Sequence, residues 1–325
     1  MFSTRRRILK SGLGALTWVG IANSQVPNST PDKPPMDGFD IRRFTDSTGR
    51  AHRVWTKGDG PPVLVLHELP GMTRADIRFA RRLADEGYRV VLPLLFGGPG
   101  DDGALHTGLN ILLQCSRARY DCNANNRTPH PVAWIHELCN WVPTQWKVDR
   151  GMGVVGMCLT GAFPLALLDI EHVLAPVICQ PTSPVNIATL LHLPTWNRKP
   201  KPVGIGVSDT DLNQPSTIPI LGIRYDGDRL CPSDRFDLLS THYKDRFFRL
   251  DLAGKHHSSL GKDFSCLAFE HVRRFFQQQL GTPDPNAPFP LYAHHGLKGQ
   301  VLTDCCPWDS CNAQGHSGAH LRSPG

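Results

Sequence analysis

The 325-residue sequence lacks three features that would each have defined its class directly. It has no internal repeat, no hydrophobic run long enough to span a bilayer as a helix, and no basic stripe interleaved with aromatic side chains. Because its 35 Lys and Arg residues are scattered and the net charge is only +6, we do not expect it to bind nucleic acid. What remains is a globular protein, long enough for one large α/β domain or two small ones.

The first 24 residues resemble an export signal. Arginines at positions 5–7 precede a short, weakly apolar stretch at 11–21, and small residues follow at 22–24. The paired arginines are typical of the twin-arginine type. We therefore expect the twin-arginine machinery to export the protein to the periplasm or the extracellular space, with residues 25–38 as a flexible lead-in. If the signal is not functional, the protein would be cytoplasmic.

Ten cysteines are too few for a disulfide scaffold at this length. Export would allow some of them to pair, and the spacing leaves the pairing open. Residues 281–325 are rich in Pro, Gly, His and Cys without any period, which predicts an irregular tail. A zinc site there is an alternative that the adjacent cysteines make unfavourable. Its candidate ligands are Cys305, Cys306, Cys311, His316 and His320.

Residues 39–280 alternate between strand-like and helix-like segments, after a predicted hairpin at 39–55. This alternation favours an α/β fold, with a mostly parallel central sheet and helices on both faces. Residues 181–219 are too rich in proline to assign. The other predicted strands are 62–67, 89–93, 152–155, 173–178, 219–225 and 246–252, and the predicted helices are 75–86, 132–146, 161–170, 233–243 and 264–280.

Cys158 lies in a Gly-Met-Cys-Leu-Thr-Gly turn directly after the 152–155 strand. A strand followed by such a turn is how α/β-hydrolases present a nucleophile, which here would be a thiol. A thiol needs a base, and the base needs an orienting acid. Asp228 follows one later strand, and His256 and His257 follow the next, so the order is nucleophile, acid, histidine. Taken singly, a buried structural cysteine and a turn aspartate are the simpler interpretations.

These motifs resemble the dienelactone hydrolase family. The resemblance extends to Leu-His-Glu-Leu-Pro-Gly at 66–71 and to the Ala-Asp-Glu-Gly-Tyr block at 84–93. It implies an α/β-hydrolase fold and a Cys158–His257–Asp228 triad that cleaves an ester or lactone of a small molecule through a thioester. His257 is preferred over His256 because the family has a small residue after the histidine. No cofactor and no metal ion are implied.

The resemblance also implies three supporting groups. Glu68 would hydrogen-bond the resting thiol and take part in forming the thiolate. The backbone N–H groups of Leu69 and Leu159 would form the oxyanion hole, where each donor of this type lowers a barrier by roughly 3–4 kcal/mol.

The sequence departs from the family at two points. Thr160 occupies the position of the usual glycine two residues after the nucleophile, and no arginine follows His257 shortly to hold a lactone carboxylate. These departures leave an alternative: a protein that keeps the fold without turnover and acts in thiol redox chemistry or in small-molecule binding.

Overall fold

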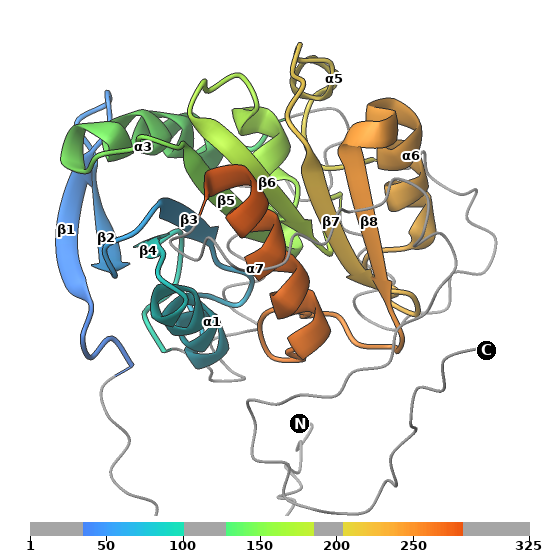
Figure 1. Ribbon diagram of the computed structural model, residues 1–325, viewed down its shortest axis with the longest axis horizontal. Coiled ribbons are helices and arrows are strands. Elements are labelled where there is room, and N and C mark those ends of the chain that lie inside the picture. The colour runs from blue at the N-terminus through green and yellow to red at the C-terminus, as the bar shows by residue number, and fades with distance from the viewer. Residues whose placement is uncertain (1–34, 101–127, 185–203, 282–325) are drawn as a thin grey trace, which may run out of the picture. The chain divides into compact units, whose positions relative to one another are not determined.

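The computed structural model describes residues 35–100, 128–184 and 204–281. Their strands form one 8-stranded sheet in the order β1-β2-β4-β3-β5-β6-β7-β8 (Figure 1). The first three strands in this order pair antiparallel, and all the later pairs are parallel. The mostly parallel sheet confirms the prediction. The strands are β1 Asp40–Thr45, β2 Ala51–Lys57, β3 Pro62–Leu66, β4 Arg89–Pro93, β5 Met152–Met157, β6 Val173–Cys179, β7 Ile220–Tyr225 and β8 Phe247–Leu252.

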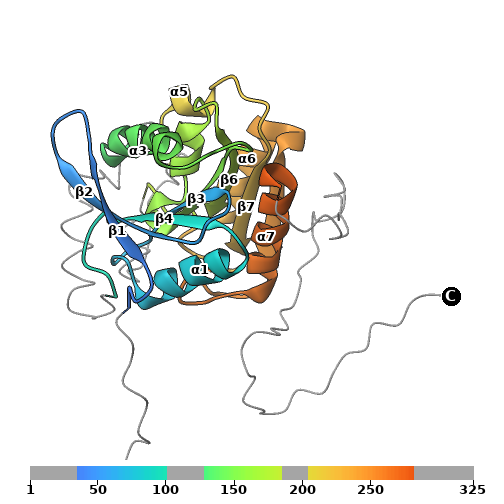
Figure 2. The ribbon, with the colours of Figure 1, turned by 60° about the vertical axis from the view of Figure 1, so that its left-hand side comes forward.

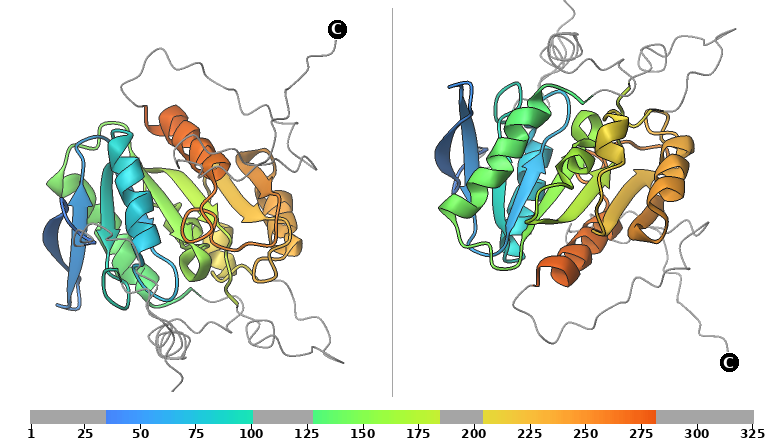
Figure 3. Two further views of the ribbon diagram at one scale, coloured as in Figure 1. Left: turned by 90° about the horizontal axis from the view of Figure 1, so that it is seen from below. Right: turned by 90° about the horizontal axis from the view of Figure 1, so that it is seen from above.

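Helices cover both faces of the sheet, as Figures 2 and 3 show. Neighbouring strand residues point to opposite faces, so Val154 joins the core under α3 and α6, while Val155 joins the core under α1 and α7. Because both faces are covered, β5 is buried along its whole length, as its apolar sequence predicts. The helices are α1 Arg74–Asp85, α3 Pro131–Gln145, α5 Asp209–Leu212, α6 Ser233–Tyr243 and α7 Cys266–Leu280.

The α-helix predicted at 161–170 is wrong. The chain forms two short 3-10 helices there instead, η1 Cys158–Thr160 and η2 Phe163–Leu167. Pro164 has no N–H, and in an α-helix its ring would clash with the carbonyl group four residues earlier. The turns close with i+3 hydrogen bonds, including one of 3.0 Å from the Gly161 N–H to the Cys158 carbonyl oxygen.

Several predictions concern residues outside the described ranges. The export signal at 1–24, most of the lead-in and nearly all of the tail, with its zinc-ligand candidates, lie there and stay predictions. Within the described ranges, no helix has the length and apolar character needed to cross a membrane.

Candidate active site

Six adjacent parallel strands, β4, β3, β5, β6, β7 and β8, end at the same edge of the sheet (Figure 1). The predicted site residues lie just beyond four of these ends. Glu68 follows β3, Cys158 follows β5, Asp228 follows β7 and His257 follows β8. Residues separated by up to 189 positions in the sequence therefore meet because their strands are parallel and adjacent.

The backbone at Cys158 is strained. Its φ angle is 54°, in the left-handed region that a residue with a Cβ rarely adopts. The turn is also tight, because a Cβ on Gly156 would lie 2.2 Å from the carbonyl oxygen of Thr160. Cys158 is 8% exposed at the end of a buried strand. These are the features of a nucleophile elbow.

Thr160 fits this turn because its hydroxyl group is fully used. The hydroxyl oxygen accepts a hydrogen bond of 3.0 Å from the Met157 N–H and donates one of 2.9 Å to the Leu66 carbonyl oxygen. The side chain is completely buried. A β-branched residue at the usual glycine position therefore ties the elbow to the end of β3 rather than disturbing it.

His257 and Asp228 form a close pair, with 2.7 Å between Nδ1 and Oδ2. The other carboxylate oxygen of Asp228 accepts hydrogen bonds from the N–H groups of Leu230 and Cys231, at 2.8 and 3.2 Å. This arrangement fixes the ring of His257 and leaves Nε2 as its second functional atom. Nε2 is buried and has no hydrogen-bond partner among the described residues.

The electrostatic surroundings of His257 favour its protonated form. Burial on its own lowers the pKa of His257, but the attraction to Cys158 and the hydrogen bond to Asp228 outweigh burial, and the net direction is well upward. An imidazolium at this position is suited to stabilising a thiolate.

His256 lies outside this arrangement. Its side chain is 63% exposed, and its ring packs edge-on against Tyr225 with 5.2 Å between the ring centroids. The loop is held by Asp263, whose Oδ2 accepts the N–H groups of His257 and Ser258 at 3.1 and 3.2 Å. The structure thus brings His257, and not His256, to Asp228.

Glu68 is buried beside the thiol and the imidazole. Its Oε1 accepts a short hydrogen bond from the Ser258 hydroxyl group, while its Oε2 has no partner among the described residues. Burial raises the pKa of Glu68, although His257 and Ser258 oppose the increase. Gly261 is required here, because a Cβ on it would lie 2.5 Å from Oε1.

One ligand atom each from Glu68, Cys158 and His257 lies within 4.8 Å of the other two. Sulfur, nitrogen and oxygen ligands at this separation could approach a single divalent ion such as Zn²⁺. They are equally the atoms between which a proton would move during thiol chemistry. The two expected oxyanion donors lie at the neighbouring strand ends, with Leu159 directly after Cys158 and Leu69 directly after Glu68.

Three polar residues at the site were missed by the sequence analysis. Thr182 donates a hydrogen bond of 3.2 Å from its hydroxyl group to the Cys158 sulfur. Gln180 has a strained φ of 33°, and its side-chain oxygen accepts from Ser259 at 2.7 Å. Arg235 is buried below the same loop. The signal available was the position of residues 180–182 just after the strand predicted at 173–178, but these residues carry no recognisable motif.

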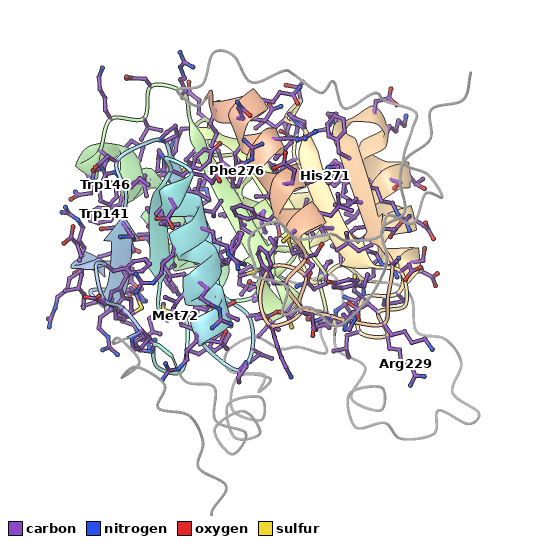
Figure 4. All side chains as sticks on the ribbon, turned by 60° about the horizontal axis from the view of Figure 1, so that its bottom comes forward. Met72, Trp141, Trp146, Arg229, His271 and Phe276 are labelled. Atoms are coloured by element: carbon purple, nitrogen blue, oxygen red, sulfur yellow. The ribbon has the colours of Figure 1, made fainter. Side chains whose placement is uncertain are left out.

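The loop after β7 carries an exposed basic residue next to the buried Asp228. Arg229, next to Asp228 in the sequence, is exposed and extends away from the ribbon, as Figure 4 shows. Asp228 points inward to His257. The strand-end loop therefore places a buried anion in the site and a solvated cation outside it.

Comparisons with known proteins agree with this architecture. Residues 51–203 match the sequence model of the dienelactone hydrolase family. The Pf2001 esterase of Pyrococcus furiosus has a TM-score of 0.57 at 14% identity, over 78% of this chain and 99% of that chain. The α/β hydrolase GrgF of Penicillium sp. sh18 has a TM-score of 0.51 at 15% identity, over 75% and 99%. No curated protein sequence matches the chain significantly.

The structural neighbours establish the α/β-hydrolase fold, and the family match confirms the resemblance to dienelactone hydrolases over residues 51–203. That family supports a hydrolase acting on a small-molecule substrate.

Proposed function

From the relationship to the dienelactone hydrolase family, we propose that this protein hydrolyses a carboxylic ester or lactone of a small molecule, with Cys158 as nucleophile, His257 as base and Asp228 as orienting acid. One observation carries the proposal. A thiol at a strained elbow lies beside the ring of a histidine whose Nδ1 is held by a buried aspartate and whose Nε2 has no hydrogen-bond partner among the described residues. This is the connectivity of a nucleophile–base–acid triad.

In the first half-reaction, the Cys158 thiol gives its proton to His257 Nε2, which forms an imidazolium–thiolate pair, and the thiolate sulfur attacks the carbonyl carbon. The tetrahedral oxyanion accepts hydrogen bonds from the N–H groups of Leu159 and Leu69, each worth roughly 3–4 kcal/mol. The carbon–oxygen bond then breaks, the alcohol oxygen leaves with the proton from His257, and a thioester remains on Cys158. In a lactone, the leaving hydroxyl stays attached to the acyl chain.

In the second half-reaction, His257 takes a proton from a water molecule as the water attacks the thioester carbonyl. The carbon–sulfur bond breaks, and its electron pair returns to the sulfur. The carboxylic acid leaves, and the imidazolium–thiolate pair is restored. Asp228 stays ionised and keeps the correct tautomer of His257 throughout.

Glu68 has a separate role in this proposal. A carboxylate oxygen of Glu68 lies within 4.8 Å of both the Cys158 sulfur and a ring nitrogen of His257, so Glu68 can accept a hydrogen bond from the resting thiol and take part in forming the thiolate when substrate arrives. A second anion beside the sulfur disfavours a permanent thiolate. Glu68 therefore protects the resting thiol from adventitious alkylation or oxidation.

Hydrolysis of p-nitrophenyl acetate tests the proposal. We expect turnover by the wild-type protein and loss of turnover by Cys158→Ala. Cys139→Ala is the matched control, because Cys139 is another buried free cysteine, located in α3 away from the site. Turnover that survives in Cys158→Ala, or its complete absence in the wild type across short esters and lactones, would reject the proposed function.

The alternative of a fold-retaining protein without turnover loses one of its supports. Thr160 is accommodated by two hydrogen bonds, so its presence does not indicate a damaged elbow. The missing arginine after His257 still argues against a dienelactone as the substrate. A screen of neutral lactones against anionic ones would separate these substrate classes.

We also propose that residues 1–24 direct export through the twin-arginine machinery. The support is the sequence alone, namely the arginines before a short apolar stretch. Replacing Arg5, Arg6 and Arg7 with lysine should retain the protein in the cytoplasmic fraction. Unchanged localisation of this variant would reject the proposal.

A further inference from the structure

The sequence analysis assigned no functional residue to β6, although this strand lies between β5 and β7 in the middle of the site edge. The loop that follows it, residues 180–184, runs beside the elbow. Gly161 permits the approach, since a Cβ there would lie 2.6 Å from the Cys179 carbonyl oxygen and 2.7 Å from the Pro181 Cα. The loop therefore packs backbone-to-backbone against the turn that carries the thiol.

Thr182 joins this loop to Cys158 at two points. Its N–H donates to the Cys158 carbonyl oxygen at 3.0 Å, and its hydroxyl group donates to the Cys158 sulfur at 3.2 Å. Thr182 is 4% exposed, so water competes little for this hydroxyl group. A hydroxyl donor aimed at sulfur stabilises a thiolate more than a thiol, because hydrogen bonds to charged groups are stronger.

A buried arginine holds the loop in this position. Arg235 of α6 donates to the carbonyl oxygens of Pro181, at 2.9 Å, and Pro184, at 2.7 Å, and makes a short contact with that of Ser183. Arg235 is only 7% exposed, and no carboxylate is paired with it among the described salt bridges. Its guanidinium group therefore donates hydrogen bonds to backbone carbonyl groups on both sides of Thr182.

We propose that Thr182 is a hydrogen-bond donor that stabilises the Cys158 thiolate, and that Arg235 is a positioning residue that holds the Thr182 loop against the sulfur. The proposal rests on the proposed function for the identity of the nucleophile. It adds a fifth strand end to the machinery, so that five of the six adjacent parallel strands each contribute one group.

The donor has its largest expected effect when the thioester breaks. In that step the sulfur leaves with the electron pair of the carbon–sulfur bond, and the Thr182 hydroxyl group stabilises the charge that it gains. His257 and Glu68 lie beside the same sulfur, Asp228 is hydrogen-bonded to the far side of the His257 ring, and Arg235 contacts the loop that carries Thr182. Removing Thr182 changes one uncharged donor and leaves all four titratable or charged groups in place.

The test is the pH dependence of Cys158 alkylation by iodoacetamide, with the modified cysteine identified by peptide mass. Thr182→Val keeps the shape of the side chain and removes the donor, and Thr182→Ser keeps the donor. We expect the alkylation midpoint of Thr182→Val to move to higher pH, with a rate about tenfold lower below that midpoint, as befits the loss of one hydrogen bond to a charged acceptor. Thr182→Ser should follow the wild type. Superimposed profiles of wild type and Thr182→Val would overturn the proposal.

Arg235→Met tests the positioning half, with thermal unfolding used to confirm that the variant is folded. We expect it to shift the midpoint in the same direction as Thr182→Val, and we expect the double variant to shift no further than Thr182→Val. An additional shift in the double variant would mean that Arg235 acts through its charge and would overturn its positioning role. If Arg235→Met does not fold, the Thr182 pair alone decides the proposal.

Alkylation requires a reactive thiol but no turnover. A wild-type protein that fails to hydrolyse any ester while its Thr182→Val variant shows the shifted alkylation profile would reject the proposed function and retain this inference. Turnover by the wild type, together with an unshifted alkylation profile in Thr182→Val, would support the proposed function and reject this inference.

Discussion

Two histidine–aspartate pairs in the described structure have the same separation but involve different ring nitrogens of the histidine. His257 and Asp228 are 2.7 Å apart at the carboxyl edge of the sheet, and His52 and Asp46 are 2.7 Å apart in the β1–β2 hairpin. Asp228 joins His257 through Nδ1 and leaves Nε2 without a hydrogen-bond partner among the described residues, while a ring nitrogen of His257 lies within 4.8 Å of the Cys158 sulfur. Asp46 joins His52 through Nε2, so the atom that could serve as a base is already occupied.

The surroundings of the hairpin pair are structural. The His52 ring stacks on Trp134 of α3, with 3.9 Å between the centroids. Asp46 also accepts three hydrogen bonds from Thr48 and Arg50, which close the turn. At the C-terminal end of α3, the rings of Trp141 and Trp146 pack edge-on with 5.8 Å between their centroids, and Figure 4 shows the two side chains next to each other. A histidine held by a buried aspartate therefore indicates catalysis only where its second nitrogen faces a reactive group.

The largest expected difference comes from the two histidines. His257→Ala should reduce kcat/KM for p-nitrophenyl acetate by about 10³-fold or more, because the proposed triad would lose its base. His52→Ala should leave kcat/KM within about twofold and lower the free energy of unfolding by about 1–3 kcal/mol, through lost packing and a lost hydrogen bond. Steady-state kinetics and urea unfolding measure the two effects. Loss of activity in a folded His52→Ala protein would contradict the purely structural role of His52.

Substitution of Asp228 should lower activity, whereas substitution of Asp46 should lower stability only, as for the two histidines. Asp228→Asn preserves the shape but favours the wrong tautomer of His257, so kcat should fall by about 10²–10⁴-fold. Asp46→Asn should affect stability without affecting kcat.

The stability effect of Asp46 has a defined pH dependence. Its hydrogen bond to His52 comes first among the interactions that hold the pKa of Asp46 well below its usual range of about 3.8. A lowered carboxyl pKa contributes stability that is present above the unfolded-state pKa and lost as the pH falls through the folded-state pKa. The thermal midpoint of Asp46→Asn should therefore lie below that of the wild type at neutral pH and converge with it in strong acid. A gap independent of pH would contradict the role of the charge.

Two glutamates give the next comparison. Glu68→Gln should change kcat/KM by about 10–100-fold and alter its pH profile, because the residue faces both the thiol and the base. Glu137 accepts hydrogen bonds from the Ser47 N–H and hydroxyl groups and fastens the hairpin to α3. Glu137→Gln should change stability by less than about 1 kcal/mol and leave the pH profile unchanged. Superimposable pH profiles for Glu68→Gln and the wild type would remove Glu68 from the mechanism.

The smallest expected effect is that of His256→Ala. Its side chain is mostly exposed and contacts Tyr225 rather than the thiol, so kcat/KM should stay within about twofold of the wild type. A loss of activity comparable to that of His257→Ala, in a protein with an unchanged thermal midpoint, would show that the base is misassigned.

Most of the sheet could be predicted from the sequence, because buried parallel strands are continuous apolar runs bounded by glycine and proline. The order of Cys158, Asp228 and His257 along the chain also predicts that parallel strand ends would bring them together. The choice between His256 and His257 depended on the family, since neighbouring loop residues differ only in the direction of their side chains. The hydrogen bonds to Asp263 set that direction, and they are tertiary contacts.

The loop after β6 could not be predicted for a different reason. Thr182 and Gln180 have no motif, and their roles come from a close backbone approach to Gly161 and from an arginine more than 50 residues away in the sequence. The helix predicted at 161–170 failed because helical periodicity does not reveal where Pro164 forces a 3-10 turn.

The most direct test of the central claim is to trap the acyl group. A rapid acid quench of the wild type during turnover of p-nitrophenyl acetate, followed by peptide mass mapping, should find one acetyl group on Cys158, with none on that peptide in Cys158→Ala. Turnover with no acylated Cys158, or with the acetyl group on another residue that proves essential, would contradict the account.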